Sequence, residues 1–153
     1  MSAEEQLRTL KISLPRLAKP GALYEDVVRD GDLLYLSGKG PRRADGTRPS
    51  GKVGAEVTLE EAVEDAHQTG LNLLAALRHE LGSLDRVMRI VKLFGMVNAA
   101  PGFEDHPRVI DGCSQLMIDV FGNRGRHARS AVGMGSLPGN MTVEIEMIAR
   151  VAP

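Results

Sequence analysis

Residues 125–146 read GRHARSAVGMGSLPGNMTVEIE, and this stretch decides how the end of the chain folds. The residues in its middle predict a strand over 130–134, and its last residues open a strand predicted over 142–151. Between them, residues 137–140 read LPGN, which is typical of a turn. The second strand contains two glutamates that alternate with apolar residues, the pattern of a strand with one buried and one polar face.

A simple hairpin about this turn would fix the relation between two charged residues. If the pairing centres on Pro138 and Gly139, Glu144 lies opposite Gly133. Arg129 is then on the same face of the sheet but four residues away, roughly 13 Å at the rise of a strand. A direct ion pair between Arg129 and Glu144 is therefore not implied. A bulge or a residue from a neighbouring subunit would be needed to bring them together.

Working outward, two helices precede this stretch. Thr58 followed by Glu61 forms the pattern of a capping box, and apolar residues continue at helical spacing until Gly82 provides a natural stop. A second helix is predicted to start at Pro107, which suits a first helical turn, and to end at Gly122. The long helix from Thr58 is the best defined element in the sequence.

The N-terminal half is predicted to begin its sheet with a hairpin. Strands over 24–29 and 33–37 flank Asp30-Gly31, a dipeptide that tolerates the backbone of a two-residue turn. This register places Tyr24 directly opposite Ser37 on one face, so that the two side chains meet in one wall of a pocket.

The order of elements indicates the fold class. An apolar, β-branched run predicts a central strand over 87–97, which completes the order ββαβαββ. This order predicts an α+β fold with a mixed sheet and both helices on one face. Residues 1–20 are expected to form an N-terminal extension with a short helix, and residues 21–153 a single domain. The uncovered face of the sheet is expected to require a partner.

Composition excludes several function classes. The 153 residues contain 19 Lys and Arg against 20 Asp and Glu, and only 3% aromatic residues, which disfavours a nucleic-acid partner. A single cysteine, Cys113, allows no internal disulfide, and no His and Cys set has metal-ligand spacing. No leader-like or membrane-spanning segment is recognised, so the expected compartment is the cytoplasm and no membrane partner is expected.

The residues Ala128-Arg129-Ser130, Leu137-Pro138 and Glu144-Ile145-Glu146 at their present spacing form a specific series. Together with Tyr24, Ser37-Gly38 and the ββαβαββ order, it resembles the RidA/YjgF family of reactive-intermediate deaminases, also described as endoribonuclease L-PSP-like proteins. The resemblance covers the chain from Gly21 to Val151. It implies a chorismate-mutase-like fold assembled as a homotrimer, with ligand clefts between subunits.

The resemblance also implies an activity and a set of site residues. Family deaminases hydrolyse enamine or imine intermediates to a 2-keto acid and ammonia without a cofactor or a metal. Arg129 is expected to bind the substrate carboxylate, Glu144 to assist catalysis, and Tyr24 and Ser37 to contact the substrate. The sequence departs from the family's site at two positions: Ala131 replaces a frequent family cysteine, and the family's substrate-contacting asparagine has no match in residues 111–114. The segment 97–103 and the N-terminal extension indicate a less characterised branch.

Other interpretations of the same residues stand beside this one. On the residues alone, Arg129 is more often a solvated surface residue, and Glu144 and Glu146 are simply the polar face of a strand. Tyr24 and Ser37 are equally consistent with packing in a hairpin. A non-catalytic trimer that binds a small carboxylate, or acts like a chaperone, is the alternative function. An endoribonuclease ranks last because the charge is balanced.

Overall fold

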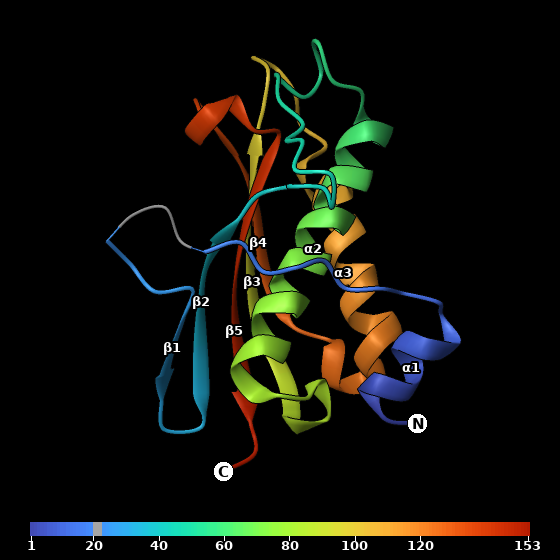
Figure 1. Cartoon of the computed structure of the whole chain (residues 1–153). Helices are drawn as coiled ribbons and strands as arrows, with labels where there is room; N and C mark the ends of the chain where they lie inside the picture. Colours follow the sequence, from blue (N-terminus) through green and yellow to red (C-terminus); the bar gives the residue numbers. More distant parts are fainter. Residues whose placement is uncertain (20–22) are drawn as a thin grey trace.

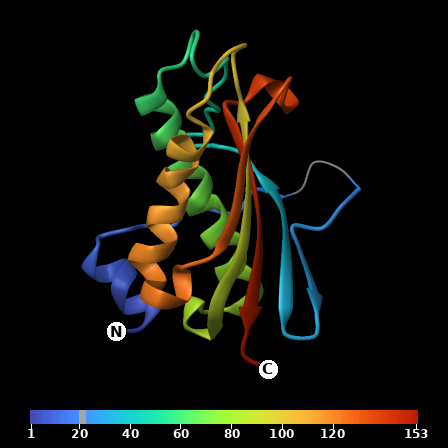
Figure 2. The same cartoon turned by 180° about the vertical axis from the view of Figure 1, so that it is seen from behind.

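Five strands form one mixed sheet in the order β1-β2-β5-β3-β4, and the long helices α2 and α3 cover one of its faces (Figures 1 and 2). The computed structural model describes residues 1–19 and 23–153. The predicted α+β layer with the order ββαβαββ is confirmed. The elements are α1 (Ala3–Thr9), β1 (Val27–Asp30), β2 (Leu33–Lys39), α2 (Leu59–Leu81), β3 (Val87–Asn98), α3 (His106–Phe121), β4 (Ala128–Met134) and β5 (Val143–Val151), with single 3-10 turns at Leu84–Arg86, Gly122–Gly125 and Pro138–Asn140.

Helix boundaries follow the local signals in the sequence. The Thr58 hydroxyl accepts from the Glu61 amide at 3.1 Å, and the Glu61 carboxylate accepts from the Thr58 amide at 2.8 Å. Both bonds satisfy amides that have no partner inside the helix, so α2 begins at residue 59. Gly82 ends α2 with a φ of +76°, and α3 carries Pro107 in its first turn and stops at Gly122. Both helix predictions are confirmed.

The last two strands are not neighbours. β4 pairs in parallel with β3 at the edge of the sheet, and β5 lies between β2 and β3, antiparallel to both. The crossover from β3 through α3 brings β4 back parallel beside β3, which leaves β5 to fill the centre. A hairpin about Pro138 and Gly139 is therefore wrong, and so is the position of Glu144 opposite Gly133: Glu144 pairs with Met96 of β3.

The first hairpin is confirmed, but its register is shifted by two residues. Val27 pairs with Leu36 and Asp30 with Leu33, so the loop is Gly31-Asp32. Gly31 has a φ of +62°, and glycine adopts this conformation at lower cost than aspartate, which is why it takes the first loop position. Tyr24 precedes β1 and does not lie opposite Ser37, whose amide instead donates to the Asp26 carbonyl at 3.0 Å.

The N-terminal helix packs onto the main fold. Ser2 and Glu5 form a second capping box, and Ala3 and Leu7 of α1 are buried. Glu4 ties α1 to the turn before β3: its carboxylate accepts from the Leu84 amide at 3.0 Å. The short helix expected in residues 1–20 is thus present. The expected domain boundary between residues 20 and 21 falls outside the described residues.

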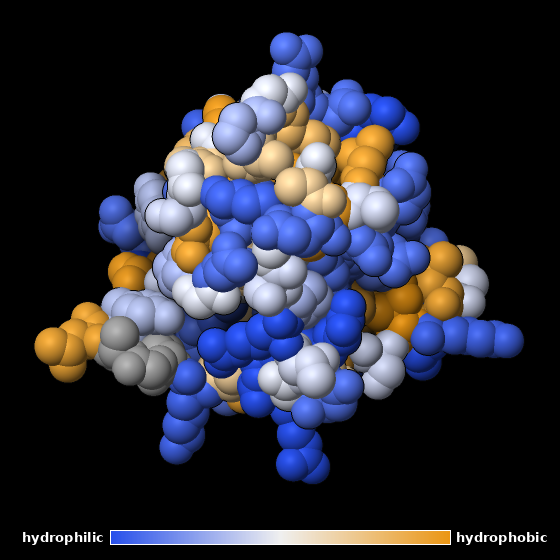
Figure 3. All heavy atoms as spheres, turned by 90° about the horizontal axis from the view of Figure 1, so that it is seen from above, coloured by the Kyte–Doolittle hydropathy of each residue, from blue (hydrophilic) through white to orange (hydrophobic). Residues whose placement is uncertain are grey.

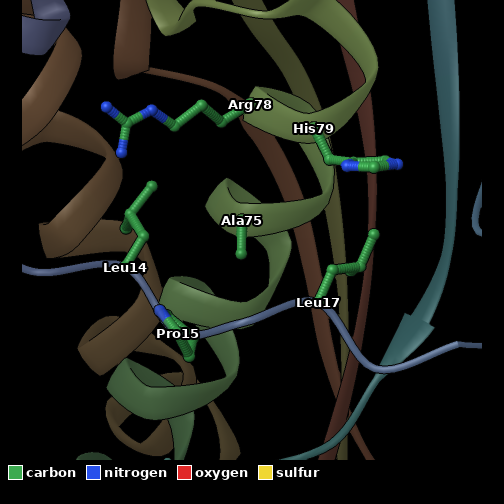
Figure 4. Close-up of a pocket in the computed structure, with 6 residues that line it drawn as sticks. All are labelled: Leu14, Pro15, Leu17, Ala75, Arg78 and His79. Atoms are coloured by element: carbon green, nitrogen blue, oxygen red, sulfur yellow. The ribbon is translucent and has the colours of Figure 1, made fainter.

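The segment after α1 crosses α2. Around a shallow hollow of about 230 Å³, three residues of this segment lie against three residues of α2 (Figure 4). The six residues are Leu14, Pro15 and Leu17 from the segment and Ala75, Arg78 and His79 from α2. The hollow contains none of the residues expected to carry chemistry.

The two faces of the sheet differ in their covering. Leu93 and Val97 of β3 are fully buried under the helices, and Gly95 lies so close to α3 that an added Cβ would stand 2.6 Å from the Ile110 side chain. The opposite face has no covering element among the described residues (Figure 2). It has a hollow of about 330 Å³ and exposes Val28 and Tyr35. We call it the open face.

The end of the molecule where β3 and β4 terminate has a mixed surface. Seen from that end, hydrophilic residues dominate and hydrophobic ones lie in separate patches (Figure 3). Within the described part of the chain, no helix combines the length and the apolar character needed to span a bilayer.

Candidate functional site

Arg129 lies on the helix-covered side of the edge strand β4. It pairs with Leu93 of β3, whose side chain is in the core, and paired residues share a face of a sheet. Its Nη1 atom donates to Asp111 Oδ1 at 2.7 Å and to Ser114 Oγ at 3.1 Å, both on α3. The Nε and Nη2 atoms bond to no protein group of the described chain, and 23% of the side chain is exposed. One edge of the guanidinium remains free for a planar anion.

Two residues that were not expected in the site continue this network. Ser114 Oγ lies 2.9 Å from His127 Nε2, and His127 Nδ1 lies 2.6 Å from the carbonyl oxygen of Gly125. Ser114 follows Asp111 by three residues and so shares its face of α3, while His127 precedes Arg129 by two residues. Both spacings, from Asp111 to Ser114 and from His127 to Arg129, are visible in the sequence. They predict a shared site only when the packing of α3 on β4 is known.

Glu144 lies on the open face, near the middle of the sheet. Its neighbours Val143 and Ile145 are fully buried toward the helices, so Glu144 projects the other way. Partial burial raises the pKa of its carboxyl, and the charge of Glu146 raises it further. The carboxyl lies over Gly38 of β2, where an added Cβ would stand 2.9 Å from Glu144 Cδ. Gly38 thus leaves the space that the carboxyl occupies.

Ser37 also lies on the open face, whereas Tyr24 lies outside the strands. Ser37 lines the open-face hollow, and its hydroxyl donates to the Glu25 carbonyl at 2.6 Å. Tyr24 lies before β1, and 51% of the residue is exposed. The bond to Glu25 holds the Ser37 hydroxyl but leaves an oxygen lone pair that can accept from a ligand.

The four expected residues are therefore not assembled within one chain. Glu144 and Ser37 share the open face, whereas Arg129 lies on the other face under α3. The hairpin predicted that Arg129 and Glu144 lie on one face, four residues apart. This prediction is wrong because β3 lies between β4 and β5. A five-stranded sheet lies between the two functional groups of a single subunit.

Two other titratable side chains, on α3 and α2, are buried and serve in packing or hydrogen bonding within the fold. Burial raises the pKa of the Cys113 thiol to about 12, so this side chain is a packing residue in α3. Burial also raises the pKa of Asp65 in α2, whose carboxylate accepts from the Thr142 hydroxyl at 2.8 Å. Within residues 1–19 and 23–153, no three His, Cys, Asp or Glu side chains are grouped to hold a metal ion.

Comparison with known proteins identifies the family. Residues 4–151 match the family described as "YjgF/chorismate_mutase-like, putative endoribonuclease". The chain belongs to this family. The resemblance to RidA/YjgF proteins, which was recognised from Arg129, Leu137-Pro138 and Glu144 in their context, is confirmed by this match over nearly the whole chain.

Three similar proteins place the chain within the YjgF family. TCP17 of Trypanosoma cruzi is 38% identical over 146 residues, which cover 95% of this chain and 91% of TCP17. The 2-iminobutanoate/2-iminopropanoate deaminase of Dermatophagoides farinae is 28% identical over 142 residues, covering 90% of this chain and 92% of the deaminase. A crystal structure described as a "putative endoribonuclease" from Shewanella oneidensis has a TM-score of 0.94 at 29% identity, covering 99% of this chain and 100% of its own.

Proposed function

We propose that this protein is a hydrolytic deaminase of small enamine or imine intermediates that carry a carboxylate. The products are a 2-keto acid and ammonia. The observation that carries the proposal is the free Nε and Nη2 edge of Arg129, partly exposed at an edge strand. The family membership and the distant imine deaminase from Dermatophagoides farinae support the reaction type.

Arg129 binds the substrate. A carboxylate accepts two parallel N–H bonds from a guanidinium, which fixes both the position and the orientation of the carbon next to it. In a 2-imino acid that carbon is the one that water attacks. Binding the carboxylate therefore places the reacting C=N bond, and this placement lowers the entropic part of the barrier.

Glu144 moves the proton. Water adds to the imine carbon to give a carbinolamine, the nitrogen takes up a proton, and the C–N bond breaks to release ammonia and leave the keto oxygen. One carboxyl can accept the proton from the water and return it to the nitrogen. The raised pKa of Glu144 suits this exchange because its proton is held closer to neutral pH. No cofactor takes part in these steps.

The site is completed between subunits of a homotrimer. The open face exposes Val28, Tyr35 and Val132, which is apolar area that a second copy of the chain would cover. In the proposed cleft, Arg129 of one subunit faces Glu144, Ser37 and Tyr24 of the next. This arrangement unites groups that a single sheet separates.

A non-catalytic carboxylate-binding protein is the second candidate. The ion pair of Arg129 with Asp111 favours it, because Asp111 reduces the positive charge that a substrate meets. Ala131 in place of the family's frequent cysteine points the same way. Endoribonuclease activity, suggested by the family's description, ranks third because Lys plus Arg (19) and Asp plus Glu (20) balance.

Incubation with freshly generated 2-iminobutanoate tests these functions. The protein should accelerate ammonia release, and Arg129→Ala should abolish the acceleration while the fold is retained. Saturable binding of 2-oxobutanoate without turnover would favour the binding protein instead. RNA cleavage by nuclease-free protein, lost in the same variant, would favour the endoribonuclease. Equal rates with and without the wild-type protein for several imines would contradict the deaminase.

A further inference from the structure

Arg129 is one end of a continuous chain of hydrogen bonds. The chain runs from Arg129 Nη1 to Ser114 Oγ (3.1 Å), from Ser114 Oγ to His127 Nε2 (2.9 Å), and from His127 Nδ1 to the Gly125 carbonyl oxygen (2.6 Å). Ser114 is 9% exposed, so its hydroxyl is largely screened from competing water. Three side chains and one backbone group are thus linked in a fixed order.

With a neutral imidazole, the chemistry of the two ends fixes every proton in the chain. The guanidinium can only donate and the Gly125 carbonyl can only accept. Ser114 Oγ therefore accepts from Arg129 and gives its own hydrogen to His127 Nε2. The proton of the neutral imidazole lies on Nδ1, where it is donated to Gly125. With neutral His127, only this arrangement of hydrogens satisfies all the members.

The surroundings keep the imidazole in this neutral form. Burial lowers the pKa of His127 and the nearby charge of Arg129 lowers it further, although the bond to Gly125 acts in the opposite direction. The other charged group that faces this cluster is Asp111 from α3, which binds Arg129 directly. Neutral His127 is the acceptor that the Ser114 hydroxyl needs.

The far end of the chain is rigid. An added Cβ on Gly125 would stand 2.0 Å from the carbonyl oxygen of Met117, so the backbone of Gly125 packs directly on the last turns of α3. Asp111, by contrast, has a side chain that is 62% exposed. An exposed ion pair defines the position of an arginine weakly. The part-buried link through Ser114 and His127 holds the guanidinium in a more defined position.

We infer that His127 and Ser114 are positioning residues that set the rotation of the Arg129 guanidinium, so that its Nε and Nη2 edge is presented to the carboxylate of the ligand. The identity of the ligand rests on the proposed function, whereas the restraint on Arg129 does not. Neither His127 nor Ser114 is required to touch the substrate. Their removal leaves Arg129 charged but free to rotate about its side-chain bonds, which weakens bidentate binding.

Nuclear magnetic resonance of ¹⁵N-labelled protein tests the restraint without any ligand. In the wild-type protein, His127 should show a protonated Nδ1 and an unprotonated Nε2, and rotation about the Arg129 Nε–Cζ bond should be slow enough that Nη1 and Nη2 give separate signals. His127→Ala and Ser114→Ala should average these two signals. His127→Gln is the matched variant, because its amide oxygen can take the place of Nε2 and accept from Ser114. The opposite tautomer, or separate Nη1 and Nη2 signals in both alanine variants, would overturn the inference.

Kinetics with 2-iminobutanoate test the consequence for binding. His127→Ala and Ser114→Ala should raise KM by about tenfold, the loss of one charge-assisted bond, with kcat nearly unchanged. His127→Gln should stay close to the wild-type protein. Arg129→Lys keeps the charge but has no planar guanidinium to orient, so in an Arg129→Lys background none of these changes should raise KM further, because both residues act through the guanidinium. Equal effects in the two backgrounds would indicate a general loss of structure and contradict positioning.

The outcomes separate the two proposals. If the wild-type protein neither hydrolyses the imine nor binds 2-oxobutanoate, but the alanine variants release Arg129, the proposed function fails and the positioning role stands. If turnover is efficient and the His127 and Ser114 variants alter neither KM nor the Arg129 signal, the positioning role fails and the proposed function stands.

Discussion

Mixed trimers of two inactive variants provide a direct test of the proposed site between subunits. Arg129→Ala removes the proposed carboxylate anchor and Glu144→Gln the proposed proton-transfer group, so each variant alone should be inactive. Because the two residues lie on opposite faces of one sheet, a cleft of the proposed trimer would take each of them from a different subunit. In an equimolar random mixture, half of the subunits have intact Arg129 and half have intact Glu144. About one quarter of the clefts then contain both groups.

The assay is ammonia release from 2-iminobutanoate after the two variants are unfolded and refolded together. The mixture should recover about one quarter of the wild-type rate per chain. As a control, Arg129→Ala is mixed with the double variant Arg129→Ala, Glu144→Gln, a combination in which no cleft is complete and the rate should stay at background. Background activity in the first mixture, with wild-type activity recovered after the same refolding, would refute a cleft built from two subunits.

Three further perturbations follow from single contacts. Gly112→Ala should lower the free energy of unfolding, measured by denaturant titration, by about 3 kcal/mol, because the new Cβ would stand 2.1 Å from a backbone oxygen of α2. Gly135 has open space around it, so the control variant Gly135→Ala should change this free energy by less than about 0.5 kcal/mol. Burial raises the pKa of Asp65, so the stabilisation by its protonated form is present below about pH 4 and is lost as the pH rises through the folded-state pKa. The free energy of unfolding of the wild-type protein, measured relative to Asp65→Asn, should therefore fall over this range of pH. A difference between the two proteins that does not change with pH would contradict this. Gly38→Ala should displace the flexible Glu144 carboxyl and lower kcat by at least about tenfold with little change in thermal midpoint; an unchanged kcat would show that this position is not critical.

Local signals predicted much of the fold. The start of α2 was predictable because Thr58 and Glu61 satisfy each other's amides within four residues, and its end because Gly82 tolerates a positive φ. The register of the first hairpin was missed by two residues. The register depends on whether Asp30 or Gly31 takes the first, left-handed position of the loop. A shift of two residues leaves every side chain on the same face of the sheet, so the pattern of apolar residues cannot distinguish the two registers.

Non-local relations were not predictable in the same way. The placement of β5 between β2 and β3 depends on strand pairing across the whole chain, and the pattern of apolar residues in β5 is the same beside either neighbour. For this reason Arg129 and Glu144 were expected on one face. Ser114 and His127 were not assigned to the site because their contact depends on the rotation of α3 against β4.

The docking of α1 has a consequence for the order in which the chain folds during synthesis. Its polar contacts are with residues much later in the sequence: the Glu4 carboxylate forms an ion pair with Arg78 at 2.9 Å. That carboxylate also accepts from the Leu84 amide, and the Glu4 amide donates to the Asp85 carboxylate, each at 3.0 Å. A helix of 7 residues has little stability by itself. Because α1 is synthesised before its partners, it must wait until α2 and the turn after it have left the ribosome. α1 is therefore among the last of these elements to reach its place.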